Sequence, residues 1–415
     1  MPVEPRPAIA AAHAGSAESD SPDERVVRVG SPASLLALVP NLLGFAPTSC
    51  VVVIGAEPPR GRVRLTMRFD LPATPDAEVA DEIAEHAIDV LTAQGFRHGV
   101  AVGYGPGVLV TPVADALRSR AAQVGFHLAD VLRAHEGRYW SYLCTDPACC
   151  PPDGVPYDVA GHPVTAAFSE AGAPPVLASR EELAATVSAL DGEAGGSMTQ
   201  ATLHAQERAD RLVATATSSG GTAAARRLIA TAGLDAAREA VDAYRAGSEL
   251  SSDNDAAWLL LLLRDLRVRD DAWSRMDPDH QEAHLRLWTD LTRRARPGYV
   301  AAPASLLAFV AWQHGNGVLA NIALDRALAD TPRYPMAQLL REVIDSGVPP
   351  LLSRLPITPE EVAASYAEDE AGPAPDEAAT AYEAGTCAVA DPAGCFHNAD
   401  QADAAAGPPD SGPIA

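Results

Sequence analysis

The residues of this sequence that could do chemistry concentrate in one short segment rich in cysteine and proline. Three thiols fall within seven residues, Cys144, Cys149 and Cys150. Thiolates bind Zn²⁺, and His162 or Asp153 would be its fourth ligand. A disulfide between Cys144 and either member of the pair is the redox alternative. The third interpretation is that these thiols only pack a proline-rich loop, and the spacing leaves all three open.

A second candidate site is a glycine loop that follows an apolar strand and precedes a helix. Its glycines are Gly103, Gly105 and Gly107. Ligands of α/β sheets often bind at the carboxyl ends of strands, and a helix N-terminus favours anions. The spacing differs from the dinucleotide-binding fingerprint. We therefore expect either a tight strand-to-helix connection or a small-molecule site that Trp140 and Tyr142 complete.

The elements that position these residues follow from the apolar patterning of the first half of the chain. Continuous or alternating apolar runs predict strands, and a 3.6-residue period predicts helices. The expected elements are strand 26–29, helix 33–43, strand 50–55, strand 62–70, helix 76–94, strand 98–105, helix 111–124, strand 129–135 and strand 138–143. Hairpins interrupt the parallel order, so we predict an α/β domain with a mixed sheet over residues 25–177.

Capping and turn residues support this order of elements. Ser31 is expected to cap the first helix and Gly44 to end it. Glu136 and Gly137 are expected to join two strands as a two-residue hairpin turn.

The second half of the chain, residues 178–355, reads as an all-α domain. Ser179 and Glu182 form a capping box that opens a helix. Further helices are expected at Met198–Ser218, Thr222–Ala230, Asp235–Gly247, Asp253–Val268, Asp277–Arg294, Pro303–His314, Gly317–Ala329 and Met336–Ser346.

Residues 301–334 resemble a single tetratricopeptide-like helical hairpin. Small or apolar side chains stand where two antiparallel helices approach, and Gly315 lies between them. The interpretation is either a hairpin that closes the α domain or the end of a short array that grips a partner. The second alternative predicts an apolar groove beside Trp312.

Composition bounds the classes of function. All 31 basic residues are Arg, which excludes chemistry that needs a lysine, and the net charge of −24 argues against nucleic acid or an anionic membrane as partner. The first twenty residues lack the pattern of a signal peptide, and six cysteines are too few for a disulfide scaffold. We expect a cytoplasmic protein with disordered tails at 1–24 and 356–415, the second of them acidic.

Three groups of residues together carry a family resemblance. They are Leu42-Leu43-Gly44-Phe45 with Pro47, Trp140-Ser141-Tyr142-Leu143-Cys144 with Asp146-Pro147 and Cys149-Cys150-Pro151-Pro152, and Ala302-Pro303 with Leu306-Leu307-Ala308-Phe309 and Ala311-Trp312. On these residues the chain resembles a bacterial family catalogued as domain of unknown function 4192, found mainly in actinobacteria. The resemblance spans residues 26–352. It implies the architecture and supplies no activity.

The sequence leaves three functions open and does not decide whether the protein is an enzyme. The first is a protein-binding or scaffold module that acts through its helical domain. The second is a small-molecule enzyme or sensor with a site where the glycine loop meets the segment 140–150. The third is a thiol or zinc switch at Cys144, Cys149 and Cys150. The oligomeric state and the partner are not encoded in any pattern that we can identify.

Overall fold

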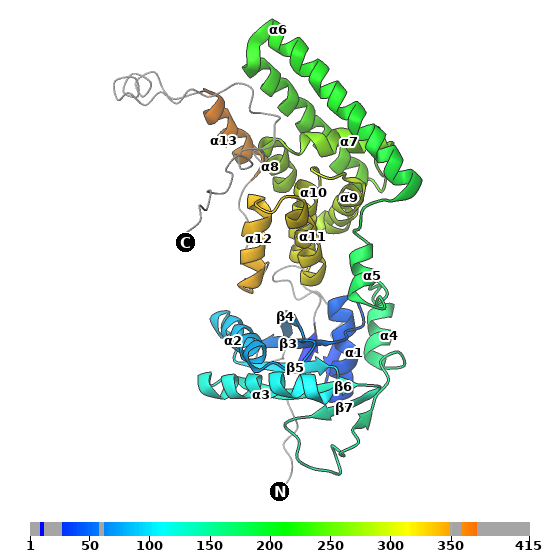
Figure 1. Cartoon of the computed structure of the whole chain (residues 1–415), viewed down its shortest axis with the longest axis vertical. Coiled ribbons are helices and arrows are strands. Elements are labelled where there is room, and N and C mark those ends of the chain that lie inside the picture. Colours follow the sequence, from blue (N-terminus) through cyan, green and yellow to red (C-terminus); the bar gives the residue numbers. More distant parts are fainter. Residues whose placement is uncertain (1–8, 12–26, 58–61, 349, 351–357, 372–415) are drawn as a thin grey trace, which may run out of the picture.

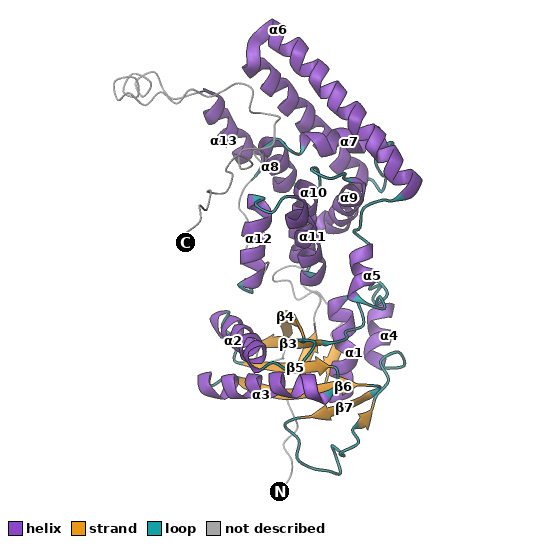
Figure 2. Ribbon diagram, in the orientation of Figure 1, coloured by secondary structure: helices purple, strands orange, loops and turns teal. Residues whose placement is uncertain are grey.

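The fold is described from a computed structural model of the full chain, over residues 9–11, 27–57, 62–348, 350 and 358–371. Strands gather at one end of the molecule and long helices at the other (Figures 1 and 2). This arrangement confirms the predicted order of a mixed α/β region followed by a helical region. No helix of the described ranges is both long and apolar enough to cross a membrane.

Eight strands form one sheet in the described part of the chain, in the order β2-β1-β4-β3-β5-β6-β7-β8. They are β1 Ile9–Ala11, β2 Val27–Val29, β3 Cys50–Glu57, β4 Arg62–Asp70, β5 His98–Tyr104, β6 His127–His135, β7 Arg138–Ser141 and β8 Val155–Pro156. Strands β5 and β6 run parallel, whereas β3 is antiparallel to both of its neighbours. The sheet is therefore mixed, as the hairpins in the sequence predict.

Helices cover both faces of the sheet. Helices α2, Ala77–Ala93, and α3, Gly107–Val124, pack on one face, and α1, Pro32–Leu43, with α4, Pro163–Glu170, on the other (Figure 1). Strand β3 shows why: Val51 and Val53 belong to the core under α2 and α3, whereas Val52 and Ile54 belong to the opposite core. A strand buried on both faces needs the unbroken apolar run seen in the sequence.

Local signals begin and end these elements as expected. The Ser31 hydroxyl accepts the N–H of Ser34 at 3.2 Å, and Gly44 ends α1 in the left-handed region at φ 80°. Glu136 and Gly137 both have positive φ, 48° and 72°, and join β6 to β7. This is the backbone of a two-residue hairpin turn whose twist matches that of the strands.

The helical region begins after α4. Its helices are α5 Arg180–Ala185, α6 Gly192–Arg245, α7 Asp253–Leu262, α8 Leu266–Ser274, the 3-10 turn η1 Pro278–His280, α9 Gln281–Arg294, α10 Ala301–Gln313, α11 Gly317–Asp330 and α12 Pro335–Asp345. Helix α10 is buried on all sides, and Trp288 of α9 is fully buried beside it in the same core. This core also includes α1 and one face of the sheet.

Two predicted sets of helix boundaries are wrong. The chain does not break between the predicted helices Thr222–Ala230 and Asp235–Gly247. The bend of α6 at Gly221, where φ is 74° and ψ is −176°, lies in the predicted break between Ser218 and Thr222. Gly233 sits within α6 because a Cβ there would meet Val268 Cγ2 at 2.4 Å, so the glycine serves packing and not a break. The predicted helix Asp253–Val268 is two helices, because Asp265 caps α8 by accepting the N–H of Arg267.

Helices α10 and α11 form the expected antiparallel hairpin. Gly315 turns the chain at φ 80°, and the Asn316 side chain accepts the N–H of Leu319 at 3.0 Å. The tetratricopeptide-like detail stays a prediction. Trp312, expected beside an apolar groove, is 6% exposed and packs against Phe309 with ring centroids 6.1 Å apart.

The boundaries of both predicted tails need correction. Strand β1 lies inside the predicted tail 1–24 and pairs with β2 and β4, because a three-residue segment suffices to extend a sheet edge. The predicted tail 356–415 contains helix α13, Pro359–Ala371. Thr358 and Glu361 exchange side chain to backbone hydrogen bonds of 2.8 and 3.2 Å, a capping box that begins it. The other residues of these tails lie outside the described ranges.

Candidate metal centre in the cysteine loop

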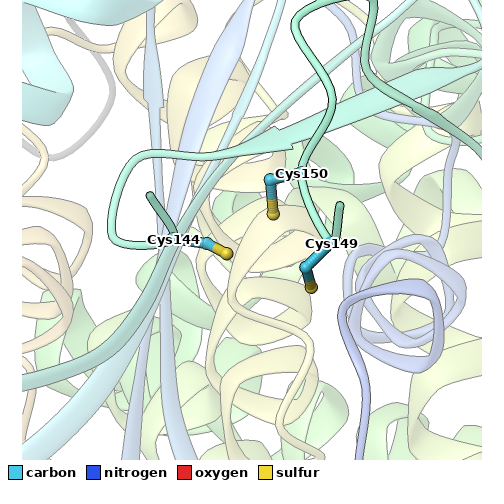
Figure 3. Close-up of side chains that lie close together, drawn as sticks. All are labelled: Cys144, Cys149 and Cys150. Carbon is cyan, nitrogen blue, oxygen red and sulfur yellow. The ribbon is translucent and has the colours of Figure 1, made fainter. Parts of the chain in front are cut away.

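Three thiols come together in the loop between β7 and β8, which we call the cysteine loop, residues 142–154. The sulfur atoms of Cys144, Cys149 and Cys150 all lie within 4.8 Å of one another (Figure 3). Cys149 is exposed, and the other two side chains are half-buried. None of the three forms a disulfide within the described residues. In the part of the chain that the structure describes, these three side chains form a group of potential ligands that could hold a metal ion.

The start of the cysteine loop is fixed by Ser141, the last residue of β7. Its hydroxyl accepts the N–H groups of Leu143 and Cys144, each at 3.2 Å, and donates to Asp130 Oδ1 at 2.7 Å. Asp130 is a buried residue of β6, 8% exposed. A buried carboxylate needs hydrogen-bond donors, so this contact ties the loop to the sheet.

A turn at Asp146 brings the vicinal pair back toward Cys144. The Asp146 carbonyl oxygen accepts the N–H of Cys149 at 3.1 Å and that of Cys150 at 2.7 Å. Its carboxylate accepts the N–H of Ala148 at 2.9 Å. Aspartate favours such turns because its side chain bonds to the backbone two residues on.

Trp140 holds the far end of the cysteine loop. Its indole N–H donates to Pro152 O at 2.9 Å, and a Cβ at Gly154 would lie 2.6 Å from the ring. The guanidinium of Arg133 stacks on the ring 3.6 Å from its centroid. Arg138 donates to Gly154 O at 2.9 Å. The Trp140 side chain therefore anchors the end of the loop, and Arg133 occupies a face of its ring that a ligand would need for stacking.

The electrostatics of the thiol group depend on its crowding. Burial, followed by hydrogen bonding and charge repulsion from Cys144 and Cys149, together raise the pKa of Cys150 to about 12. Without a cation the three cannot all ionise near neutral pH. A bound divalent ion reverses this, because it deprotonates the thiols that coordinate it.

The geometry fits a thiophilic ion. Zn–S bonds are about 2.3 Å long, which places sulfur atoms of a tetrahedral site about 3.8 Å apart. The three sulfur atoms are close enough to reach this spacing by small side-chain rotations. Thiolates select Zn²⁺, Cu⁺ and iron–sulfur clusters over hard cations such as Mg²⁺.

His162 and Asp153 do not join the thiol group. His162 caps α4, and its Nδ1 accepts the N–H of Val164 at 3.2 Å. Asp153 uses its carbonyl oxygen to accept from Arg138 at 3.2 Å. His135 of β6 is not part of the thiol group either, and its Nε2 lies 3.8 Å from Glu136 Oε1. Proximity in the sequence therefore did not identify a fourth ligand.

Packing accounts for Gly103 and Gly107 of the glycine loop, and backbone conformation accounts for Gly105. A Cβ at Gly103 would lie 2.2 Å from Val110 Cγ1, and one at Gly107 would lie 3.1 Å from Arg133. Gly105 has φ 152°. Helix α3 begins at Gly107 rather than at the predicted Thr111, because Pro106 already has the conformation of a helix cap.

The structure joins the glycine loop to the cysteine loop through a residue that the sequence analysis missed. Arg133 lies between Gly107 and the Trp140 ring, and Tyr142 shares a 2.8 Å hydrogen bond with Thr111 of α3. The signal was available, because a two-residue turn at 136–137 pairs Arg133 with Trp140 across the hairpin.

The chain belongs to a class of proteins that join a mixed α/β sheet to a helical region. In this chain three thiols converge in the loop after the hairpin β6–β7. The chain belongs to the family described as Domain of unknown function (DUF4192), whose model matches residues 32–351. The match includes the cysteine loop and ends before α13. Neither the curated proteins nor the solved structures give a match.

Proposed function

We propose that this protein binds a thiophilic metal ion, Zn²⁺ in the first place, through Cys144, Cys149 and Cys150. The observation that carries the proposal is the mutual approach of the three sulfur atoms to within 4.8 Å. The ion would hold the cysteine loop in one conformation and release it on loss of the metal. The chain is then a metal-dependent switch, with a reducing cytoplasm as its setting.

The third cysteine favours a metal over a purely redox role. A disulfide needs two thiols, and either Cys149 or Cys150 could bridge to Cys144. Both members of the vicinal pair instead lie near Cys144, held there by their N–H bonds to Asp146. A disulfide between Cys144 and one member of the pair is the second form of the switch: after metal loss hydrogen peroxide would oxidise the two thiols to the disulfide and would itself be reduced to two waters.

The loop also has a structural reason to bind an ion. Strand β8 has only two residues. The residues 143–149 of the loop are exposed, except for the half-buried Cys144. Little apolar area is therefore buried to offset the entropy of ordering the loop. Metal binding contributes directly to the stability of such segments.

The test is metal analysis of the reduced protein by native mass spectrometry and elemental quantification. We expect one Zn²⁺ per chain, lost in Cys149→Ser and in Cys144→Ser. Cys50→Ala is the matched control, because this thiol is fully buried in β3 and belongs to the core. It should keep the ion. Reduced wild-type protein that binds no Zn²⁺, Cd²⁺ or Co²⁺ would show that the proposal is wrong.

We propose the helical region, with its tetratricopeptide-like hairpin α10–α11, as the place where a protein partner would bind. The hairpin packs small residues between its helices, including Ala308, Ala320 and Ala323, all fully buried. Trp312, beside which the sequence predicts an apolar groove, is itself buried and leaves little of its ring to a partner. The metal proposal does not depend on such a partner.

A further inference from the structure

The cysteine loop supplies three sulfur ligands, and a thiophilic divalent ion prefers four ligands. Where the fourth ligand comes from decides what the site can do. Structural zinc sites are closed by a fourth protein ligand, whereas sites that bind or transform small molecules keep one position exchangeable. The inference that follows rests on the proposed function.

The nearest polar side chains of the loop are already engaged. The Asp146 carboxylate accepts the N–H of Ala148, and its carbonyl oxygen accepts two further N–H groups. His162 Nδ1 accepts the N–H of Val164 and begins α4. Moving either side chain onto an ion would break the turn that gathers the thiols or the cap that orders the chain after the loop. In the described ranges no carboxylate or imidazole lies within 4.8 Å of all three sulfur atoms.

The thiol group is open to solvent on the Cys149 side. Cys149 is exposed, and the residues before it from Thr145 to Ala148 are exposed as well. A small molecule can therefore reach an ion at this place without any movement of the sheet or of α3.

We propose that the bound ion keeps one exchangeable coordination position, filled by water and taken by small thiols as ligands. The ion already has three soft ligands, so a sulfur donor is the class that it accepts best. In the exchange the incoming thiol binds as a thiolate, its proton passes to solvent and the water leaves, with no change in oxidation state. The centre thus binds low-molecular-weight thiols.

The neighbouring charges suit this exchange. Three thiolates and a divalent ion leave one net negative charge, and a fourth thiolate adds another. The Arg138 guanidinium donates to the carbonyl oxygens of Asp153 and Gly154 at the end of the loop, and Arg133 stacks on Trp140 beside it. These two cations at the end of the loop would offset part of the thiolate charge, and the loop also carries the carboxylates of Asp146 and Asp153.

The test uses full-length protein loaded with Co²⁺, whose visible ligand-field bands report the donor set. We expect 2-mercaptoethanol to shift these bands with a saturable dependence, and ethylene glycol, which replaces its sulfur by oxygen, to leave them unchanged. X-ray absorption of the Zn²⁺ form should count three sulfur neighbours and one oxygen, changing to four sulfur neighbours with the thiol.

Two results would overturn the inference alone. Four sulfur neighbours without added thiol, falling to three in Cys387→Ser or Cys395→Ser, would show that the chain closes its own site. One nitrogen neighbour that disappears in His162→Gln would show closure by histidine. Protein that binds neither metal would overturn the proposed function as well, so the two failures are distinguishable.

Discussion

Ser141 is the residue on which the geometry of the cysteine loop depends most directly. A serine hydroxyl can donate one hydrogen bond and accept two. All three are in use, toward Asp130 and from the N–H groups of Leu143 and Cys144. One side chain therefore connects a buried carboxylate of the sheet to Cys144, the first of the proposed metal ligands, which would be the role of an outer-shell residue at a metal site.

Ser141→Ala is expected to lower the affinity for Zn²⁺ by about 10–100-fold, the usual effect of losing an outer-shell partner. The variant keeps all three thiols but removes the acceptor that orients the Cys144 backbone. Competition with a chromophoric chelator measures the change. Ser169→Ala is the control, because that exposed hydroxyl bonds only within its own helix. Equal affinities for Ser141→Ala and wild type would contradict this role.

At the scale of elements, the predictable parts are those set by neighbours in the sequence. The cap at Ser31, the stop at Gly44 and the hairpin turn at 136–137 depend on local backbone conformation, and each occurs as predicted. The apolar run of β3 identifies a strand buried on both faces. Composition missed α13, although Thr358 and Glu361 form a capping box that the sequence displays.

Contacts between distant elements were harder to predict. The three thiols were identifiable because they are close in the sequence, but His162, twelve residues after Cys150, serves as a helix cap. The glycine loop shows the same limit. Its glycines left open a tight strand-to-helix connection or a ligand site, and the contact of Gly103 with Val110 of α3 becomes visible only when the helix packs on the strand.

The contact between β5 and α3 gives a second prediction. A Cβ at Gly103 would lie 2.2 Å from Val110 Cγ1, so Gly103→Ala overpacks this contact and should lower the free energy of unfolding by about 1–3 kcal/mol. Urea unfolding measures the change. Because Val110→Ala removes the clashing methyl groups, the double variant should lose less stability than the sum of the single variants.

Gly196→Ala is the matched control for this prediction. Gly196 lies within α6, and a Cβ there meets nothing within 4 Å. Alanine in place of glycine inside a helix stabilises by about 0.5–1 kcal/mol. If Gly103→Ala instead kept full stability, packing would not explain that glycine, and the ligand-binding interpretation of the loop would return.

At the scale of the whole molecule, the α/β and helical regions are joined by more than the chain. One apolar core runs from α1 and the sheet into the helical region. At the other side α12 reaches α2, where Gln94 donates to Ser346 O at 3.1 Å and a Cβ at Gly347 would meet Val90. We therefore expect the two regions to unfold together.

A buried histidine then gives this shared stability a dependence on pH. His284 of α9 is 1% exposed, and its Nε2 lies 3.6 Å from Asp277 with no hydrogen-bond partner. Burial, and then the charge of Arg245, lower its pKa below the ordinary value of 6.5, while Asp277 acts in the opposite direction. The neutral ring is favoured in the folded protein.

The sign follows from proton binding. Below about pH 6.5 the unfolded chain takes up a proton on His284 that the folded protein resists. The free energy of unfolding should therefore fall on acidification from pH 7 to 5.5, with this group contributing at most about 1.4 kcal/mol per pH unit. Asp277, whose pKa is also lowered, adds its loss only at more acidic pH.

Urea unfolding at several pH values between 7 and 5.5 measures this slope. The comparison is between the protein with His284 and the His284→Gln variant. Both should carry Cys149→Ser, because metal binding by thiolates is itself pH-dependent and would add a second slope. His284→Gln removes the titrating ring, so its slope should be shallower by the contribution of one group even if its stability at pH 7 is lower. Parallel slopes for the two proteins would mean that His284 takes up its proton equally in the folded and unfolded states. The burial of His284 beside Arg245 would then have no effect on the pH dependence of the free energy of unfolding.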